Sequence, residues 1–233
     1  MLYLIGLGLG NEKSMSVYGL ETIKKCKKVF LENYTSKLES KNFDFRFVDV
    51  DRNFVENFNV LEAKKEDIAL CIIGDVFGAT THISIYNECK EKNINVEVIN
   101  NASIITAVGI SGLSLYNFGK IASIPFENKN IKIPIEILEN NLKINAHTLF
   151  LLDLDPEKNK FLSVKEGIEY LEKNNVKGKI LACSRLGSKD FMIKYGEMEK
   201  IKKINFGNGP YCLIIPSKKL HFVEEESLKK WEL

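Results

Sequence analysis

Short apolar runs alternate along the first half of the chain with stretches of helical period, and this pattern predicts strands and helices in turn. Residues 68–73 are apolar without interruption, as in parallel strands that are covered on both faces. Phe43, Phe45 and Phe47 alternate with other residues, which predicts a half-buried strand. The other strands expected in this half are residues 2–6, 28–32 and 96–99.

Residues that commonly cap helices precede the helical stretches. Ser16 is expected to cap a helix that runs to about Lys27, and Thr80 or Thr81 a helix that runs to Lys92. Ser103 is expected to cap a third helix. Strands that alternate with helices in this way imply a parallel sheet with its loops at one edge.

A second alternation begins after Gly109, Gly112 and Gly119, so we place a domain boundary near residue 110. The chain is then an α/β protein with two α/β domains, residues 1–110 and 111–233. Strands of the second domain are expected at residues 120–124, 148–152, 179–183, 191–195 and 211–216, with helices around 134–142 and 164–174. The last strands follow each other closely, which suggests antiparallel pairing.

The composition narrows the class of protein. A net charge of +2, with 45% hydrophobic and 27% charged residues, is typical of a globular protein and gives no support to a strongly basic nucleic-acid clamp. No apolar run is long enough for a membrane span, and the N-terminus leads straight into a strand, not into a signal peptide. The five cysteines are scattered without a CxxC motif, and the three histidines lie far apart. We therefore expect a cytoplasmic protein without a metal or a disulfide framework.

The loop Gly6-Leu7-Gly8-Leu9-Gly10 follows the first strand. A dinucleotide fingerprint needs GxGxxG, and here the third glycine comes one position early while the helix starts only near Ser16. The loop is thus a tight turn, a phosphate loop or, alternatively, a loop that lets a phosphate-free ligand approach the strand end. Asp75 also follows a buried strand, and it is either a turn residue or an acceptor that faces a ligand near Leu9.

Several segments in order resemble the diphthine synthases, a branch of the tetrapyrrole-methylase-like methyltransferases. The matching segments are Leu2 to Leu9, Glu32-Asn33-Tyr34-Thr35-Ser36, Arg52-x-x-Val55-Glu56, Gly74-Asp75-Val76-Phe77-Gly78-Ala79-Thr80-Thr81-His82, Asn101 to Lys120, Arg185-Leu186-Gly187-Ser188 and Leu220-His221-Phe222-x-Glu224. They span nearly the whole chain, and the YTS, GDxxxATTH and LHxVE patterns are specific when found together.

The resemblance implies an enzyme of diphthamide biosynthesis that uses S-adenosylmethionine. Such an enzyme trimethylates the amino group of a 3-amino-3-carboxypropyl chain on a histidine of translation elongation factor 2, which gives diphthine. The resemblance also implies a homodimer, for which Phe43, Phe45, Phe47, Phe54 and Phe58 offer weak support from the sequence. No residue of the chain stands out as a general base.

In the family, the cofactor lies in a cleft between the two domains and is held largely by main-chain groups. Carried over by motif, its contacts are Leu9, Asp75, Gly78, Ser103 and Ile104 in the first domain, and Leu152, Leu186 and Tyr211 in the second. Leu152 is as readily explained as an ordinary core residue. His82 and His221 match family motifs, and capping or packing explains them better than catalysis.

Two other functions remain open from the sequence. One is a precorrin-type methyltransferase of the same fold, although those relatives usually begin with GxGxGD where this chain has Gly10-Asn11. The other is a non-catalytic α/β module that binds a nucleotide. Binding of S-adenosylhomocysteine separates the second alternative from both enzymes.

Overall fold

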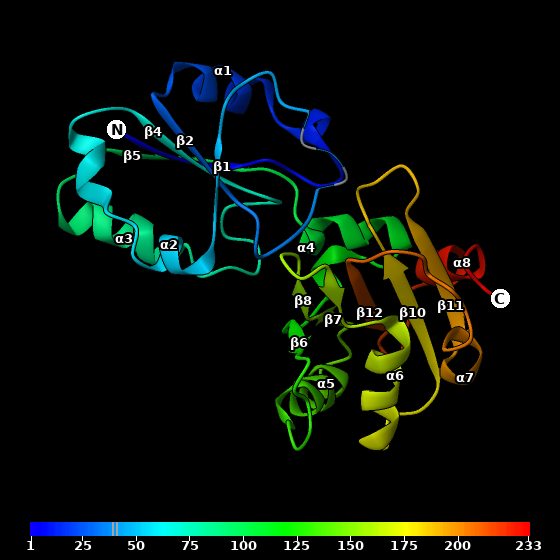
Figure 1. Cartoon of the computed structure of the whole chain (residues 1–233). Coiled ribbons are helices and arrows are strands. Elements are labelled where there is room, and N and C mark those ends of the chain that lie inside the picture. The colour runs from blue at the N-terminus through cyan, green and yellow to red at the C-terminus, as the bar shows by residue number, and fades with distance from the viewer. Residues whose placement is uncertain (39, 41) are drawn as a thin grey trace. The chain divides into compact units, whose positions relative to one another are not determined.

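The computed structural model describes residues 1–38, 40 and 42–233. The chain divides into two compact units, one of Met1–Ala107 with Pro156–Lys158 and one of Val108–Asp155 with Asn159–Leu233. Figure 1 labels the main helices and strands. In the part of the chain described here, no helix is both long enough and apolar enough to cross a membrane.

The first unit contains a five-stranded sheet in the order β3-β2-β4-β1-β5, in which every neighbouring pair is parallel. Its elements are β1 (Leu2–Gly6), η1 (Glu12–Ser14), α1 (Val17–Lys25), β2 (Lys28–Glu32), β3 (Val48–Val50), α2 (Arg52–Glu56), η2 (Val60–Lys64), β4 (Ile68–Ile72), α3 (Ile83–Glu91), β5 (Val96–Ile99) and α4 (Ile104–Ala107). The strands expected at 2–6, 28–32, 68–73 and 96–99 and the parallel sheet are confirmed.

Strand β4 shows why an uninterrupted apolar run forms a central strand. All five of its residues are buried, and successive side chains point to opposite faces of the sheet. Ile68, Leu70 and Ile72 pack in a cluster with residues of α2, η2 and α3. Ala69 and Cys71 pack in a second cluster that includes Ile23 of α1. Figure 1 accordingly shows α1 on one side of this sheet and α2 and α3 on the other.

The caps of the first unit were only partly predictable. Ser16 caps α1 as expected, because its side chain accepts a hydrogen bond from the Gly19 amide. The expected threonine cap of α3 is wrong: the N-cap residue is His82, whose side chain makes no capping bond. The Thr80 hydroxyl instead donates to the Val76 carbonyl at 2.7 Å, within the loop that precedes the helix.

The expected strand at Phe43, Phe45 and Phe47 is also wrong, because the strand of this region is β3, just after these residues. The three rings pack on one another at centroid distances of 4.8 to 6.2 Å and against the cluster that contains Ile23. Phe54 and Phe58 likewise pack together, at 5.9 Å. All five rings contact partners within their own unit, but only Phe58 is buried and Phe54 is still 37% exposed, so their packing does not decide whether the chain forms a dimer.

The second unit contains a five-stranded sheet in the order β11-β10-β12-β7-β6, in which only the β6–β7 pair is parallel. Its elements are η3 (Val108–Ser111), η4 (Leu115–Asn117), β6 (Ala122–Ile124), α5 (Ile133–Lys143), β7 (Thr148–Leu152), β8 (Leu154–Asp155), β9 (Lys160–Phe161), α6 (Val164–Lys173), β10 (Lys179–Ser184), β11 (Met192–Glu197), α7 (Met198–Ile201), β12 (Tyr211–Ile215) and α8 (Phe222–Lys229). The expected antiparallel pairing is confirmed, whereas the β8–β9 hairpin, α7 and α8 were not expected.

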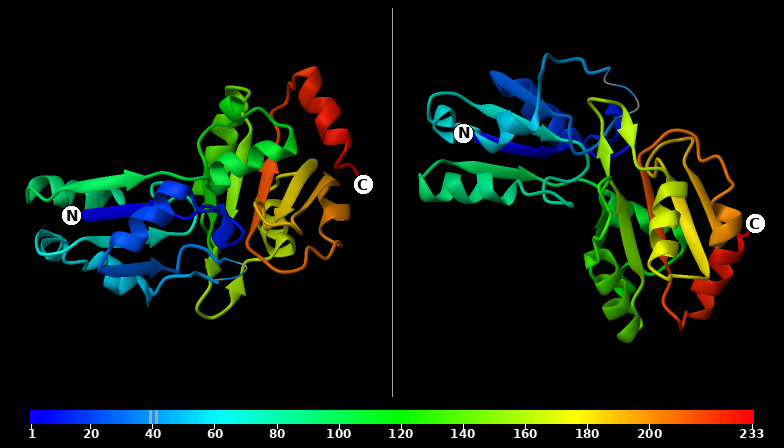
Figure 2. Two further views of the ribbon diagram at one scale, coloured as in Figure 1. Left: turned by 90° about the horizontal axis from the view of Figure 1, so that it is seen from above. Right: turned by 60° about the horizontal axis from the view of Figure 1, so that its bottom comes forward.

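Helices cover both faces of the second sheet. On one face, Phe150, Ala182 and Leu213 pack with residues of α5, α6 and α7 in the largest core cluster of this unit. On the other face, His147, next to β7, is bonded to Glu224 of α8. The two views of Figure 2 likewise show α6 and α8 on opposite sides of the sheet.

Candidate functional site

The carboxyl ends of β1, β4 and β5 lie side by side, because β1 is hydrogen-bonded to both of the other strands. Ligands of parallel α/β sheets bind at this edge. Three loops leave these strand ends, and they contain the five site residues expected in the first unit: Leu9, Asp75, Gly78, Ser103 and Ile104.

A short antiparallel bridge joins the loop after β1 to the loop after β4. The Gly8 amide donates to the Gly74 carbonyl at 3.0 Å, and the Gly74 amide donates to the Gly8 carbonyl at 2.8 Å. Leu9 and Asp75 each follow one of these glycines. The bridge therefore brings the backbones of two expected site residues close together.

Glycine is required in the first loop for two separate reasons. Gly8 has a φ of +76°, a conformation that L side chains rarely adopt, and a Cβ there would lie 2.8 Å from the Ser14 hydroxyl oxygen. A Cβ on Gly6 would lie 2.8 Å from the Gly74 carbonyl oxygen. The loop is thus built for close approach of backbone to backbone, and a dinucleotide fingerprint is not needed to explain its glycines.

The Asp75 carboxylate is held by three donors of its own unit. One oxygen accepts from the Asn101 amide at 3.0 Å and from the Asn100 side chain at 3.1 Å, and the other accepts from the Phe77 amide at 3.0 Å. Burial alone would raise the pKa of Asp75, but these donors outweigh it and lower the pKa below its usual value. The carboxylate fastens the loop after β4 to the loop after β5, so any ligand contact falls on a group that is already fixed.

Gly78 and Ser103 lie against each other. A Cβ on Gly78 would lie only 2.7 Å from the Cβ of Ser103, so a larger residue at 78 would push the two loops apart. Ser103 is buried, and its hydroxyl accepts from the Ile105 amide at 3.2 Å, close to the start of α4. The expected capping role of Ser103 is therefore seen, and it places Ile104 in the first turn of α4.

Two residues that hold these loops together were missed from the sequence. The Asn101 side chain donates to the carbonyls of Gly6 and Ser14 at 3.0 and 3.1 Å. The Ser14 hydroxyl donates to the Leu7 carbonyl at 2.9 Å. Asparagine at the end of a strand was the available signal, but a side chain that bonds distant main-chain carbonyls leaves no spacing pattern in the sequence.

Replacing Asp75 with asparagine is expected to lower the free energy of unfolding by about 1–3 kcal/mol, because an amide nitrogen would face amide donors. Urea denaturation at neutral pH measures this loss. The control is Asp44→Asn, since Asp44 forms an exposed ion pair with Lys24, and its replacement should cost clearly less stability than that of Asp75. Equal small losses in the two variants would show that Asp75 does not fasten the loops.

The three site residues expected in the second unit gather at one end of its sheet. Tyr211 begins β12 and is paired with Ser184, the last residue of β10. Leu152 ends β7 and is paired with Ile124, the last residue of β6. Because β12 runs antiparallel to β7 and β10, these strand ends meet at the same edge. Leu186 follows Ser184 by two residues at this edge.

The side chains at this edge differ in what they offer a ligand. Leu152 is buried in the core cluster of α5 and α6, so its side chain is a core residue and only its backbone is free for another role. Leu186 is buried as well. The Tyr211 ring packs edge-on against Phe161 at a centroid distance of 6.5 Å, and its hydroxyl donates to the Gly207 carbonyl.

The two histidines that match family motifs are buried or act as caps. His82 is buried with its Nε2 atom 4.0 Å from a carboxylate oxygen of Glu32, which is itself buried. Glu32 accepts from the amides of Tyr34 and Thr35 at 2.9 and 2.7 Å. His221 is the N-cap residue of α8, and its ring accepts from the Val223 amide at 3.4 Å.

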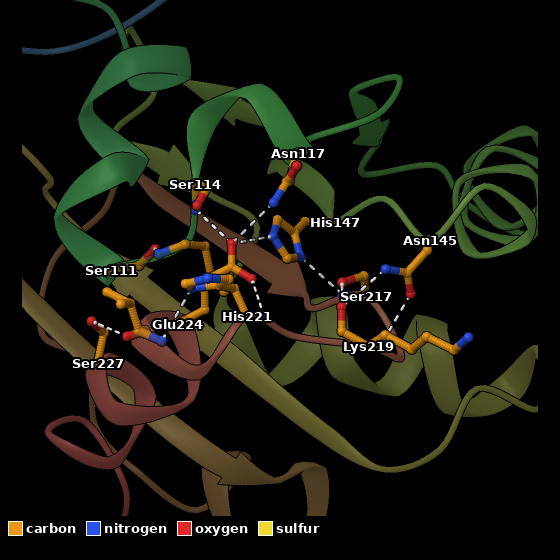
Figure 3. A network of polar contacts seen from close by, with 12 residues as sticks. Ser111, Ser114, Asn117, Asn145, His147, Ser217, Lys219, His221, Glu224 and Ser227 are labelled. Carbon is orange, nitrogen blue, oxygen red and sulfur yellow. Dashed lines mark hydrogen bonds and ion pairs between the residues drawn. The ribbon is translucent and has the colours of Figure 1, made fainter.

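A buried carboxylate organises the other face of the second unit (Figure 3). One oxygen of Glu224 accepts from the Ser114 amide at 2.9 Å and from His147 Nε2 at 3.1 Å, and the other accepts from the His221 amide at 3.0 Å. The Ser217 amide donates to His147 Nδ1 at 2.9 Å, so the proton of the ring sits on Nε2. Burial alone would raise the pKa of Glu224, but these donors outweigh it and lower the pKa to about 2.

This network explains the pattern around residues 220–224 as a structural one. Glu224 and His221 form a capping box that starts α8, and the same carboxylate fixes the segment before β6. The five cysteines are all free thiols. Among the described residues, no group of three or more His, Cys, Asp or Glu side chains could hold a metal ion.

The comparisons with known proteins agree with this geometry. Residues 1–202 match the model of the family "Tetrapyrrole (Corrin/Porphyrin) Methylases". The diphthine synthase of Methanosphaera stadtmanae is 35% identical over 98% of this chain and 94% of its own length. A protein of Arabidopsis thaliana named "Probable diphthine methyl ester synthase" is 36% identical over 98% of this chain and 97% of its own length.

A crystal structure of a diphthine synthase superposes with a TM-score of 0.92, at 34% identity, and covers 99% of this chain and 95% of the other. The relatives are therefore matched along nearly their whole length, in both units. The chain belongs to the tetrapyrrole methylase family and, within it, to the diphthine synthases.

Proposed function

We propose that the protein uses S-adenosylmethionine to methylate the amino group of a 3-amino-3-carboxypropyl chain on a histidine of translation elongation factor 2, in the cytoplasm, and that three transfers give diphthine. The observation that carries the proposal is the full-length likeness to diphthine synthases, which extends through both sheets. A precorrin-type activity rests on the name of the family alone, because the relatives described above are named for diphthine chemistry.

The strand ends of the first unit fit a ligand that is held by main-chain groups. The backbones at Gly6, Gly8 and Gly74 approach one another closely, and Asp75 and Asn101 fix these loops, so main-chain groups are held in place at the strand ends. We assign the cofactor contacts to Leu9, Asp75, Gly78, Ser103 and Ile104 of the first unit and Leu152, Leu186 and Tyr211 of the second.

The bound cofactor supplies a methyl group on a sulfonium, which a neutral amine can displace directly. The protein's part is to align the acceptor nitrogen and to exclude water from the reacting groups. The acceptor amine must lose its proton before it reacts, so the rate is expected to rise with pH until another step limits it. His82 is buried, His147 is bonded to the buried carboxylate of Glu224, and His221 caps α8. None of the three is assigned as a general base.

Titration calorimetry with S-adenosylhomocysteine tests the cofactor assignment. We expect saturable binding with one site per chain, and much weaker binding of NAD and of ATP. Preference for a phosphorylated nucleotide, or no binding of S-adenosylhomocysteine by folded protein, would favour a nucleotide-binding module and contradict the proposal.

We also propose that the protein is a homodimer. The family resemblance suggests this, and the second unit carries exposed apolar side chains that a partner copy could cover. Tyr116 of η4 is 89% exposed and Phe222 of α8 is 64% exposed, and the Ser114–Glu224 hydrogen bond links these two elements.

Light scattering tests this proposal. The unaltered protein is expected to have twice the mass of one chain, and the double variant Tyr116→Asp, Phe222→Asp is expected to have the mass of one chain. A concentration-independent mass of one chain for the unaltered protein would contradict the proposal.

A further inference from the structure

Two neighbouring residues of the second unit carry buried polar atoms without a partner. Among the described residues, the buried side-chain atoms with no hydrogen bond are His82 Nε2, Ser184 Oγ and Arg185 Nε. Such atoms are rare in folded proteins, and each one asks for an explanation. Ser184 ends β10 and Arg185 follows it, so both residues belong to the same end of the second sheet.

Both atoms lie at the edge of the second sheet that holds Leu152, Leu186 and Tyr211. Ser184 is paired with Tyr211 in β12 and with Met192 in β11. Opposed residues of neighbouring strands point to the same face, so the Ser184 and Tyr211 side chains share a face of the sheet. Burial raises the pKa of the Tyr211 phenol, and the positive charge of Arg185 opposes this rise, as expected for a guanidinium close to the ring.

The guanidinium of Arg185 is only partly occupied. Its Nη2 atom lies 2.6 Å from a carboxylate oxygen of Asp190 and donates to the Asp190 carbonyl at 3.1 Å, while Nε has no partner. Nε and a terminal nitrogen together form the fork that binds both oxygens of a carboxylate. Asp190 thus occupies one of these two donors, Nη2. The Asp190 side chain is 62% exposed, so it can turn into solvent.

Arg185 also differs from the other arginines of the chain. Arg46 and Arg52 are exposed, whereas the Arg185 side chain is 22% exposed. Its backbone is tied on both sides, since its amide donates to the Pro210 carbonyl at 2.9 Å and its carbonyl accepts from the Ser188 amide at 3.0 Å. A half-buried cation with a fixed backbone, which follows a residue with an unused hydroxyl donor and acts on the neighbouring Tyr211, is suited to an anionic group of a ligand.

We propose that Ser184 and Arg185 form a binding site for the carboxylate of a 3-amino-3-carboxypropyl group, and that Asp190 occupies part of the site until this carboxylate displaces it. The inference rests on the proposed function, in which the cofactor and the modified histidine both carry this group. The Ser184 hydroxyl and Arg185 Nε donate to the incoming carboxylate, and Asp190 turns to solvent.

The test uses three variants of the full chain and a pair of cofactor-like ligands. Arg185→Gln and Ser184→Ala remove donors, and Asp190→Asn weakens the internal competitor. S-adenosylhomocysteine carries the carboxylate, and 5′-methylthioadenosine lacks the whole aminocarboxypropyl group. The acceptor is elongation factor 2 that carries the precursor side chain. Arg46→Gln is the matched control, because it removes an exposed arginine of the first unit.

If the site binds the cofactor, Arg185→Gln weakens S-adenosylhomocysteine binding about tenfold or more and leaves methylthioadenosine unchanged. If it binds the acceptor, cofactor affinity is unchanged and the KM for the modified factor rises by a similar ratio. In either arm Ser184→Ala acts in the same direction and Asp190→Asn strengthens binding, a gain that misfolding cannot produce.

The inference is overturned if Arg185→Gln and Arg46→Gln both keep normal affinity and KM, or if Asp190→Asn weakens binding. These failures differ from failure of the proposed function. If only the inference fails, the unaltered protein still binds S-adenosylhomocysteine and methylates the factor. If the proposed function fails, the unaltered protein does neither.

Discussion

Replacing Glu224 with alanine is expected to be among the most damaging single substitutions in the second unit. It would leave the Ser114 amide, the His221 amide and His147 Nε2 without their acceptor, and it would remove the capping box of α8. Each buried donor that loses its acceptor costs about 1–3 kcal/mol, and three donors are affected here. We expect this fall in the free energy of unfolding in urea denaturation, with the midpoint moving to a lower urea concentration.

Glu224 also makes the stability of the folded state depend on pH. The pKa of Glu224 is about 2, against an ordinary value of 4.5, so its ionised form favours the folded state. Its contribution, about 3 kcal/mol, is complete above pH 4.5 and is lost as the pH falls toward 2. The alanine variant should therefore lose less stability than the unaltered protein over this range.

Glu225 provides the matched control for Glu224. It is the next residue on α8, but it is exposed. Glu225→Ala is expected to change stability by about 0.5 kcal/mol or less. If both variants behave alike, the network around Glu224 does not stabilise the fold.

Replacing Gly8 with valine is expected to have the largest effect on cofactor binding in the first unit. The new side chain must adopt a φ of +76° and would press on Ser14, which itself bonds the Leu7 carbonyl. The bridge between Gly8 and Gly74 would open, and with it the approach of the two loops. We expect S-adenosylhomocysteine affinity to fall about a hundredfold or more, which corresponds to about 3 kcal/mol.

A second glycine separates local strain from damage to the site. Gly178 lies in the loop between α6 and β10 with a φ of +110°, and a Cβ added there would meet no atom within 4 Å. Gly178→Val therefore carries backbone strain without touching the loops after β1 and β4. Its melting temperature should fall while S-adenosylhomocysteine affinity stays normal. Equal losses of affinity in both variants would show that Gly8 matters only through overall stability.

Local patterns in the sequence were sufficient to predict an element where its own residues, or one nearby contact, determine the structure. The apolar run at 68–73 needs cover on both faces, and β4 receives it. The Ser16 cap depends on the Gly19 amide three residues away. The prediction of a strand at Phe43, Phe45 and Phe47 was wrong, because these alternating rings pack on each other and their segment does not join the sheet.

The loops at the strand ends were predictable from the sequence, and the contacts within them were less so. The loops that follow β1, β4 and β5 were identified, since strand ends and glycines are visible in the sequence. Two of the three donors on Asp75 were not, because Asn100 and Asn101 come from a distant segment that only the fold brings close. The unused donors of Ser184 and Arg185 were equally hidden, since an absent partner has no sequence pattern.

The central claim is that this chain methylates the diphthamide precursor on elongation factor 2. Its most direct test is the intact mass of the peptide that carries the modified histidine, after incubation of the factor with this protein and S-adenosylmethionine. The factor without the 3-amino-3-carboxypropyl group is incubated in parallel. We predict up to three added methyl groups on the modified factor and none on the unmodified one. Equal methylation of both, or none on either while S-adenosylhomocysteine is shown to bind, would contradict the account.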